Sequence, residues 1–293
     1  MIMRKTIEIK IEKKEDGLAL KTVLSKEIGL SRREISRLKF EKGLWINGHE
    51  ARVTETVHTD DVIELIFPEK DTGHAIRILN KPDILYEDED LVIVNKPAGM
   101  VAHPSHEHLD DDMGTLLRNY YGGNFTIRAV GRLDKDVSGI MVYAKNQPAA
   151  ARLSKQRSEE ILHKIYFAFA EGKFTQKKGT LQYSLKKVDG RKDRQIDDNG
   201  QKCFTDYEVI KECGALSLLK ISIRTGRTHQ IRAGMSYASH PLAGDELYGG
   251  SIEFISRPAL HCGHVEMEQP FTHKKISIDC PLPEDMEKLK NEK

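Results

Sequence analysis

Hydrophobic and polar positions follow two different periods in the first part of the chain. Residues 6–17 begin with apolar and charged residues in alternation, which predicts a half-buried strand, and residues 18–29 then place apolar residues at helical spacing. Helical spacing returns over 30–43, after a serine followed three residues later by a glutamate, the pattern of a capping box. Apolar runs at 44–48, with an Asn-Gly pair, and at 60–67 predict two strands. This part of the chain is therefore predicted to fold as a small α/β unit.

A polar stretch with glycine and proline separates this unit from the rest of the chain. We predict a domain at 1–70, a linker at 71–82 and a larger domain at 83–293. Strand patterns dominate beyond the linker. The helical patterns there are 114–121, 147–160 and 228–239. This order predicts an α+β fold for the larger domain, built on a mixed, mainly antiparallel sheet.

Two local expectations concern the second half of the larger domain. The segment 173–200 is highly charged, which predicts an exposed hairpin or loop. Thr228 is expected to cap the helix that follows it, and that helix should end before Pro241.

Composition narrows the class of protein without identifying a partner. The 293 residues are 39% hydrophobic, which supplies a real core, and 46 Lys and Arg against 45 Asp and Glu give a formal net charge of +1. The four cysteines are far apart and form no C-x-x-C pair, which is typical of reduced thiols in a cytosol. No run of about 18 apolar residues and no signal peptide occurs. We therefore expect a cytoplasmic protein that does not bind membranes.

Asp134 and Asp136 stand two residues apart in the sequence Arg-Leu-Asp-Lys-Asp, directly before an apolar run. Two carboxylates could act as acid and base. A glycosidase, however, needs them about 5 to 9 Å apart on opposing sides of a sugar, which sequence neighbours rarely achieve. Taken alone, the cluster predicts a charged turn before a strand.

The surroundings of this cluster change that interpretation. The sequence GRLDKDVSGIMVYAKN closely resembles the central motif of the RluA-type pseudouridine synthases, in which Arg-Leu-Asp is followed by Ser-Gly and Ala-Lys. The resemblance continues, between residues 84 and 250, through LVIVNKPAGMVAHPS, HKIYFAFAEG, FTDYEV and RTGRTHQIRAGM with HPLAGDELYG. Residues 13–68 resemble an S4 domain, a small RNA-binding module. The resemblance implies an isomerase that detaches uracil from ribose in RNA, turns the base and rejoins it through C5, without a cofactor.

The resemblance assigns three residues to catalysis. Asp134 corresponds to the catalytic aspartate, which acts either as a nucleophile on the anomeric carbon or as a base on the neighbouring sugar position. Arg232 corresponds to the basic residue that pairs with this aspartate and keeps it charged in a pocket that excludes water. Tyr166 corresponds to the tyrosine that stacks on the target base, and we expect its hydroxyl to help remove the C5 proton. Asp136 is assigned to the turn.

Further basic residues are expected to bind the RNA. Arg132 adjoins the catalytic motif, and Lys164 lies on the same strand face as Tyr166. Arg227 stands at the start of a predicted helix, where phosphate binds readily. In the S4-like part, one basic helix face is expected to make sequence-independent phosphate contacts. The residues of that face are Arg32, Arg33, Arg37 and Lys39.

Three positions depart from the pattern of the family. Many members have histidine where this chain has Gly131 and Gly234, and threonine where it has Val137. These positions flank the core motifs, so they bear on nucleotide flipping and on substrate choice. Two histidine-containing clusters, at 103–112 and 261–264, lack the ligand spacing of a metal site, and no metal is predicted.

The sequence leaves alternative functions open. A catalytically inactive RNA-binding factor for ribosome assembly would have no chemical reason to keep Asp134, Tyr166 and Arg232 together. A nucleic-acid glycosidase would share the first step but release free uracil. The expected target is large-subunit ribosomal RNA, with transfer RNA as the second candidate, and the expected state is a monomer.

Overall fold

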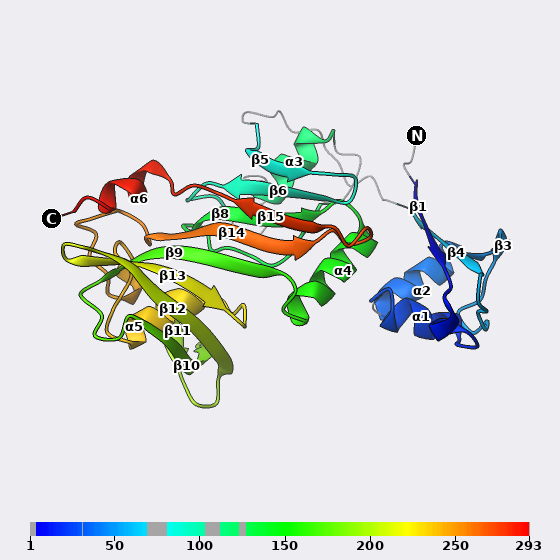
Figure 1. Cartoon of the computed structure of the whole chain (residues 1–293), viewed down its shortest axis with the longest axis horizontal. Coiled ribbons are helices and arrows are strands. Elements are labelled where there is room, and N and C mark those ends of the chain that lie inside the picture. The colour runs from blue at the N-terminus through cyan, green and yellow to red at the C-terminus, as the bar shows by residue number, and fades with distance from the viewer. Residues whose placement is uncertain (1–3, 31, 69–80, 103–111, 123–126, 293) are drawn as a thin grey trace.

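The computed structural model of the chain describes residues 4–30, 32–68, 81–102, 112–122 and 127–292 (Figure 1). These residues form two units, each with its own sheet and its own hydrophobic core. Most of the predicted linker, and the serine predicted to cap the second helix, lie outside the described residues. No helix within the described ranges is long and apolar enough to cross a membrane.

The N-terminal unit is an antiparallel sheet in the strand order β1-β4-β2-β3, packed against two helices. Its elements are β1 (Arg4–Lys10), η1 (Lys13–Glu15), α1 (Leu20–Lys26), α2 (Arg32–Phe40), β2 (Leu44–Ile46), β3 (His49–Glu50) and β4 (Val62–Pro68). Leu20 and Leu24 lie one helical turn apart on α1, and both are fully buried in the core of this unit. Asn47 and Gly48 form the turn between β2 and β3, and both have positive φ, as the tightest hairpin turns require. The helices and strands predicted for this unit are thus confirmed.

The larger unit is built on one sheet that contains eleven strands in the described residues (Figure 1). The order is β11-β10-β12-β13-β9-β14-β8-β6-β5, with β15 beside β14 and β7 beside β8. The first strands are β5 (Ile84–Glu87), β6 (Leu91–Lys96), β7 (Arg128–Ala129), β8 (Ser138–Ala144), β9 (His163–Glu171) and β10 (Lys178–Lys187). The others are β11 (Arg194–Ile196), β12 (Gln201–Cys213), β13 (Leu216–Ile223), β14 (Leu260–Glu268) and β15 (Lys275–Asp279). Among these pairs β14 and β8 are parallel and the rest are antiparallel, which confirms the predicted mixed, mainly antiparallel α+β fold.

Short helices complete the larger unit. They are α3 (Met113–Tyr120), α4 (Gln147–Ser158), α5 (Gln230–Tyr237), η2 (Glu246–Tyr248) and α6 (Glu284–Leu289). Residues of α3 and α4 pack into one core with the central strands β6 and β8, and every residue of β8 is buried. The loop that enters β8, which carries Asp134, is therefore anchored to the core.

The Ser-Gly pair of the motif, Ser138 and Gly139, opens β8, and its small size has a steric reason. A Cβ at Gly139 would lie 2.2 Å from the carbonyl oxygen of Cys262 on β14, and its φ of 108° also favours glycine. The preceding Ser138 lies buried with its Oγ 2.9 Å from Nδ1 of His261. The missing Cβ of Gly139 lets the two strands approach, and the Ser138–His261 hydrogen bond joins them, which supports the parallel pairing of β8 and β14.

Two expectations for the second half can be compared with the structure. The charged segment forms the β10–β11 hairpin, as predicted. The cap prediction was wrong: α5 begins at Gln230, and its N-cap residue is His229, in the left-handed conformation with φ of 57° and no side-chain capping bond. The His229 side chain makes contacts away from the helix instead. Strands β14 and β15 and helix α6 were not predicted.

Candidate active site

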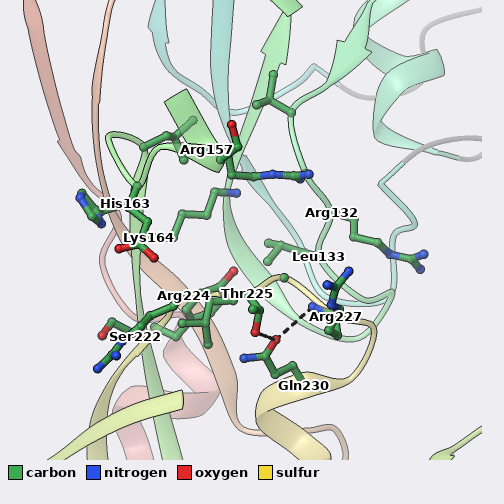
Figure 2. Close-up of a pocket in the computed structure, with 18 of the residues that line it drawn as sticks. Arg132, Leu133, Arg157, His163, Lys164, Ser222, Arg224, Thr225, Arg227 and Gln230 are labelled. Atoms are coloured by element: carbon green, nitrogen blue, oxygen red, sulfur yellow. Dashed lines mark hydrogen bonds between the residues drawn. The ribbon is translucent and has the colours of Figure 1, made fainter. Parts of the chain in front are cut away.

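An open cavity of about 1390 Å³ lies beside the loop that enters β8, strand β9 and the start of α5 (Figure 2). These segments are far apart in the sequence, and the sheet brings them together. The cavity is lined by every site residue that was predicted in the larger domain. These are Arg132, Asp134, Lys164, Tyr166, Arg227 and Arg232. The sequence motifs thus converge on one place.

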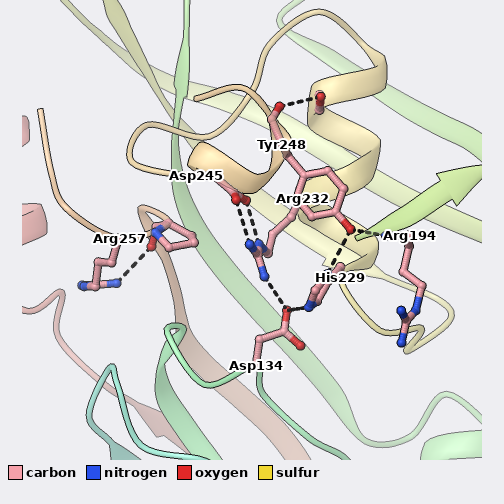
Figure 3. Close-up of polar contacts among 9 residues, drawn as sticks. Asp134, Arg194, His229, Arg232, Asp245, Tyr248 and Arg257 are labelled. Carbon is pink, nitrogen blue, oxygen red and sulfur yellow. Dashed lines mark hydrogen bonds and ion pairs between the residues drawn. The ribbon is translucent and has the colours of Figure 1, made fainter. Parts of the chain in front are cut away.

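Asp134 and Arg232 form an ion pair at the wall of this cavity (Figure 3). Nη1 of Arg232 lies 3.5 Å from Oδ2 of Asp134, whose side chain is 16% exposed. The same guanidinium donates two hydrogen bonds of 2.7 Å to the buried carboxylate of Asp245. Burial lowers the pKa of Arg232, but the hydrogen bonds and charge of Asp245, with the charge of Asp134, raise it more. Arg232 therefore stays charged and is held in one orientation toward Asp134.

His229 is the second group that approaches the Asp134 carboxylate. Its Nε2 lies 3.8 Å from the same Oδ2, and its Nδ1 lies 2.9 Å from the hydroxyl of Tyr248. The Tyr248 hydroxyl accepts a hydrogen bond from the backbone N–H of Arg194 at 2.7 Å, and its own O–H can then donate to Nδ1 of His229. In this arrangement a neutral His229 carries its proton on Nε2, toward Asp134. Burial lowers the pKa of His229, and although Asp134 raises it, the net direction is downward, which favours this neutral form.

The turn before α5 is fixed by Gln230 (Figure 2). Its Oε1 accepts hydrogen bonds from Oγ1 of Thr225 at 2.8 Å and from the backbone N–H of Arg227 at 3.1 Å. Its Nε2 donates to the carbonyl oxygen of Phe204 at 3.0 Å. These contacts define the path of the loop that carries the exposed side chain of Arg227 to the cavity.

Tyr166 and Lys164 lie on β9, two residues apart. Tyr166 is only 6% exposed and belongs to the hydrophobic core, yet it also lines the cavity. Burial raises the pKa of the Tyr166 hydroxyl, so the phenol is neutral at neutral pH. Burial lowers the pKa of Lys164, whose Nζ donates to the carbonyl oxygen of Ile140 at 3.3 Å.

Lys96, which was not predicted as a site residue, stabilises the loop that carries Asp134. Its side chain is fully buried, and its Nζ donates to three carbonyl oxygens, those of Pro97 at 2.9 Å, Met100 at 2.7 Å and Lys135 at 3.0 Å. Burial lowers its pKa to about 8, which leaves the ammonium charged at neutral pH with three N–H donors. Because Lys135 follows Asp134 directly, Lys96 links the loop that carries Asp134 to the end of β6.

Asp245 and Tyr248 were also missed as parts of the site. They belong to AGDELYGG, residues 243–250, most of which is part of the last motif in the resemblance. It is a turn, since η2 spans Glu246–Tyr248, but its acid and its phenol hold Arg232 and His229 in place. A buried arginine requires a carboxylate partner, so a search for an acidic residue in the remaining motifs could have found Asp245.

The departure from the family pattern at Gly234 has a steric cause. A Cβ at Gly234 on α5 would lie 2.3 Å from the hydroxyl of Tyr183, which donates to the carbonyl oxygen of Gln230 at 2.6 Å. The ring of Tyr183 thus occupies the space that a histidine side chain at position 234 would need. The glycine and the tyrosine form a matched pair in this chain.

Of the residues predicted to bind RNA in the N-terminal unit, only Lys39 has a described side chain, and it does not line the cavity. The side chains of Arg32, Arg33 and Arg37 lie outside the described part of the structure, and Lys39 is exposed on α2. Ser25, Lys26 and Gly29, at the end of α1 and after it, line the cavity instead. The prediction for α2 stays untested.

The second of the two histidine clusters, at 261–264, lies in the described part of the structure. Most of 103–112 lies outside the described residues. His261 hydrogen-bonds with Ser138 and with the carbonyl oxygen of Cys280, and His264 lies 2.7 Å from Asp279. Within the described ranges, no group of three or more His, Cys, Asp or Glu side chains is placed to hold a metal ion.

Known proteins resemble the chain along most of its length. Residues 90–237 match the family model described as RNA pseudouridylate synthase, and residues 7–63 match that of the RluD ribosomal pseudouridine synthase N-terminal domain. The uncharacterized RNA pseudouridine synthase YjbO of Bacillus subtilis is 35% identical over 90% of this chain and 95% of its own length. The ribosomal large subunit pseudouridine synthase D of Borreliella burgdorferi is 32% identical over 87% of this chain and 83% of its own.

A solved structure shares the fold. Human RNA Pseudouridylate Synthase Domain Containing 4 superposes with a TM-score of 0.57 at 21% identity, over 71% of this chain and 91% of its own. The first family model covers half of the chain, and the relatives cover nearly all of it. The chain therefore belongs to the RNA pseudouridine synthase family and is an isomerase that converts uridine in RNA to pseudouridine.

Proposed function

We propose that this enzyme modifies large-subunit ribosomal RNA and that Asp134, Arg232 and Tyr166 carry the reaction. The relatives of Borreliella burgdorferi and Yersinia pestis are named ribosomal large subunit pseudouridine synthase D, and the latter is 34% identical over 71% of this chain. The match of residues 7–63 to the N-terminal domain of a ribosomal pseudouridine synthase supports the same target. The observation that carries the catalytic assignment is the Asp134 carboxylate, aimed by Arg232 at the edge of the cavity.

The geometry around Asp134 supports a role for one of its two oxygens. Both Arg232 and His229 come closest to Oδ2, and Figure 3 draws the other oxygen pointing away from them. We assign that second oxygen to the ribose of the target nucleotide, as nucleophile or as base. The donors at Oδ2 stabilise the carboxylate without blocking the reacting oxygen.

The remaining cavity residues fit a flipped nucleotide. A uridine inside structured RNA must leave its stack to reach Asp134, at a cost of a few kcal/mol that contacts in the pocket offset. We assign the ring of Tyr166 to the detached uracil, because a flat aromatic face retains the base and lets it turn in its plane. Arg132, Lys164 and Arg227 are assigned to the RNA backbone and the flipped nucleotide.

We further propose that the N-terminal unit adds affinity for RNA. The domain limits remain those predicted: an S4-like domain at 1–70, a linker at 71–82 and a catalytic domain at 83–293. The basic residues of α2 would contact phosphates of the RNA. The enzyme would bind RNA as a monomer, without a partner subunit. Changing Arg32, Arg33, Arg37 and Lys39 together to glutamine should weaken RNA binding and flatten its salt dependence. Unchanged binding would leave this role without support.

Mapping of pseudouridine tests the target. Total RNA from cells with and without this gene should differ at uridines of the large-subunit ribosomal RNA. A difference confined to transfer RNA would favour the second candidate and contradict the ribosomal assignment. No difference in any RNA would favour an inactive assembly factor, and release of free uracil by the purified protein would favour a glycosidase.

A further inference from the structure

The cavity extends beyond the residues that the proposed mechanism uses. One end holds Asp134 and Arg232, and the other is lined by the last two turns of α4 and by Ser25 and Lys26 of the N-terminal unit. The two units touch there, where Nζ of Lys155 on α4 lies 3.3 Å from the carbonyl oxygen of Lys26. A single flipped nucleotide needs only the first end, so the second end is free for neighbouring parts of the RNA.

Arg157, in the last turn of α4, reaches from this second end toward the catalytic loop. A Cβ at Gly131 would lie 3.2 Å from Nη1 of Arg157, and Gly131 has a φ of 83°, which favours glycine. The guanidinium therefore lies beside the bare Cα of Gly131, three residues before Asp134. Figure 2 draws Arg157 at the side of the cavity opposite Gln230. This chain thus has an arginine from α4 next to a position where the family frequently has histidine.

Arg157 has no carboxylate partner among the described residues. Within the described residues, no carboxylate lies within 4.0 Å of the guanidinium of Arg157, Arg132 or Arg227. Arg224, another arginine of the same cavity, differs because it donates two hydrogen bonds to Asp206. The other carboxylates that line the cavity, Glu160, Glu266 and Asp134, make no such pair with Arg157. A guanidinium that is exposed and unpaired remains available for an anion.

The electrostatics of the cavity agree with this position. Burial lowers the pKa of Lys164, and the positive charge of Arg157 lowers it further. Arg157 also acts on Tyr166, whose pKa it lowers against the larger effect of burial. Arg157 is therefore close enough to the base pocket for its charge to be felt there. Like charges so placed repel one another, and an RNA phosphate among them would relieve that repulsion.

We propose that Arg157 binds a phosphodiester of the RNA strand next to the target uridine, and that this strand extends from the active site toward the N-terminal unit. The planar guanidinium offers two parallel N–H donors that match phosphate oxygens, which an ammonium does not. The inference rests on the proposed function, because it requires an RNA substrate in the cavity. Beyond the proposed function, the inference states in which direction the RNA flanking the target uridine runs and that Arg157 binds it.

The salt dependence of RNA binding tests this proposal. The probe is an in vitro transcript of a bacterial large-subunit ribosomal RNA, and the proteins are wild type, Arg157→Gln and Arg157→Lys. Each phosphate contact with a single strand contributes about 0.7 to the slope of log affinity against log salt concentration. Arg157→Gln should weaken binding several-fold and lower the slope by about 0.7. Arg157→Lys should keep the slope but lose affinity, because the charge remains and the fork is lost.

Arg191→Gln is the matched control. Arg191 is an exposed arginine paired with Asp193 outside the cavity, and its loss should leave both affinity and slope unchanged. An Arg157→Gln slope equal to that of wild type would overturn the proposal, as would an equal loss in Arg191→Gln. Conversion of the transcript is measured separately. Wild type that binds but does not convert it contradicts the ribosomal target, whereas the slopes still decide whether Arg157 contacts phosphate.

Discussion

Arg232 is bound more closely by Asp245 than by Asp134. Its guanidinium makes two hydrogen bonds of 2.7 Å to Asp245, whereas its nearest approach to Asp134 is 3.5 Å. Asp245 thus fixes the guanidinium, and the carboxylate proposed to be catalytic, that of Asp134, faces a cation whose position is already set. Fixed charges of this kind stabilise developing charge without having to reorganise during the reaction.

The first prediction concerns this positioning role. Asp245→Asn should lower kcat by roughly 10²-fold, because the arginine loses its bidentate partner and a misplacement of about 1 Å costs that much. RNA affinity should change little, since Asp245 is buried behind the site. Asp285→Asn is the control, because it breaks a bidentate pair of the same geometry with Arg257, at a more exposed carboxylate. Equal losses of kcat in both variants would show a general loss of stability instead.

The second prediction concerns the glycine on α5. Gly234→Ala should lower the free energy of unfolding by about 1 to 3 kcal/mol, because its Cβ would overlap the Tyr183 ring. Gly226→Ala is the control, since a Cβ at that glycine meets nothing within 4 Å. In a chain that already carries Tyr183→Ala, Gly234→Ala should lower the free energy of unfolding by less than it does in the wild type. Urea unfolding measures all of these, and purely additive losses would contradict the matched pair.

The third prediction concerns the buried ammonium of Lys96. Its pKa is lowered from 10.5 to about 8, so between pH 8 and pH 10.5 the unfolded chain holds a proton that the folded chain has lost. Stability due to Lys96 must therefore rise with pH across this window. The free energy of unfolding of wild type, relative to Lys96→Met, should increase by up to about 3 kcal/mol.

Urea unfolding at several pH values between 7 and 10.5 measures this difference. Lys187→Met serves as a control for the loss of an exposed lysine. If the advantage of wild type over Lys96→Met shrank as the pH rose, the folded-state pKa would lie above its ordinary value. The three carbonyl contacts would then outweigh burial.

The fourth prediction separates the ring of Tyr166 from its hydroxyl. The phenol is neutral at neutral pH, so its oxygen can take the C5 proton only if its own proton passes at the same time to another acceptor, such as solvent in the open cavity. Tyr166→Phe should bind RNA normally and form product roughly 10²-fold more slowly. Tyr166→Leu should be inactive because it removes the aromatic face. Full activity of the Leu variant would show that Tyr166 is a core residue alone.

Much of the fold followed from local patterns. The strands β6, β8 and β9 are continuous or alternating apolar runs, and α3 and α4 begin and end within a few residues of their predicted limits. The motif residues Asp134, Tyr166 and Arg232 also line one cavity, as the resemblance implied. Strong periodicity and motif order predict these features well, because they reflect the burial and the chemistry required at individual positions.

The supporting residues of the site could not be predicted in the same way. Lys96 and Asp245 gain their roles from contacts across the sheet, with Lys135 and Arg232. The helix predicted over 228–239 includes His229, but His229 adopts a left-handed conformation that helical periodicity does not describe. Such contacts depend on tertiary structure, which one sequence does not reveal.

The carboxylate of Asp134 is proposed to perform the isomerisation, and the variant Asp134→Asn removes it. The amide keeps the size of the side chain but can act neither as nucleophile nor as base. Release of tritium from RNA labelled at uracil C5 measures turnover, and RNA affinity is measured in parallel. We predict that the variant releases no tritium above background while its affinity for RNA stays within a few-fold of wild type. Tritium release near the wild-type rate would show that Asp134 is not the catalytic carboxylate.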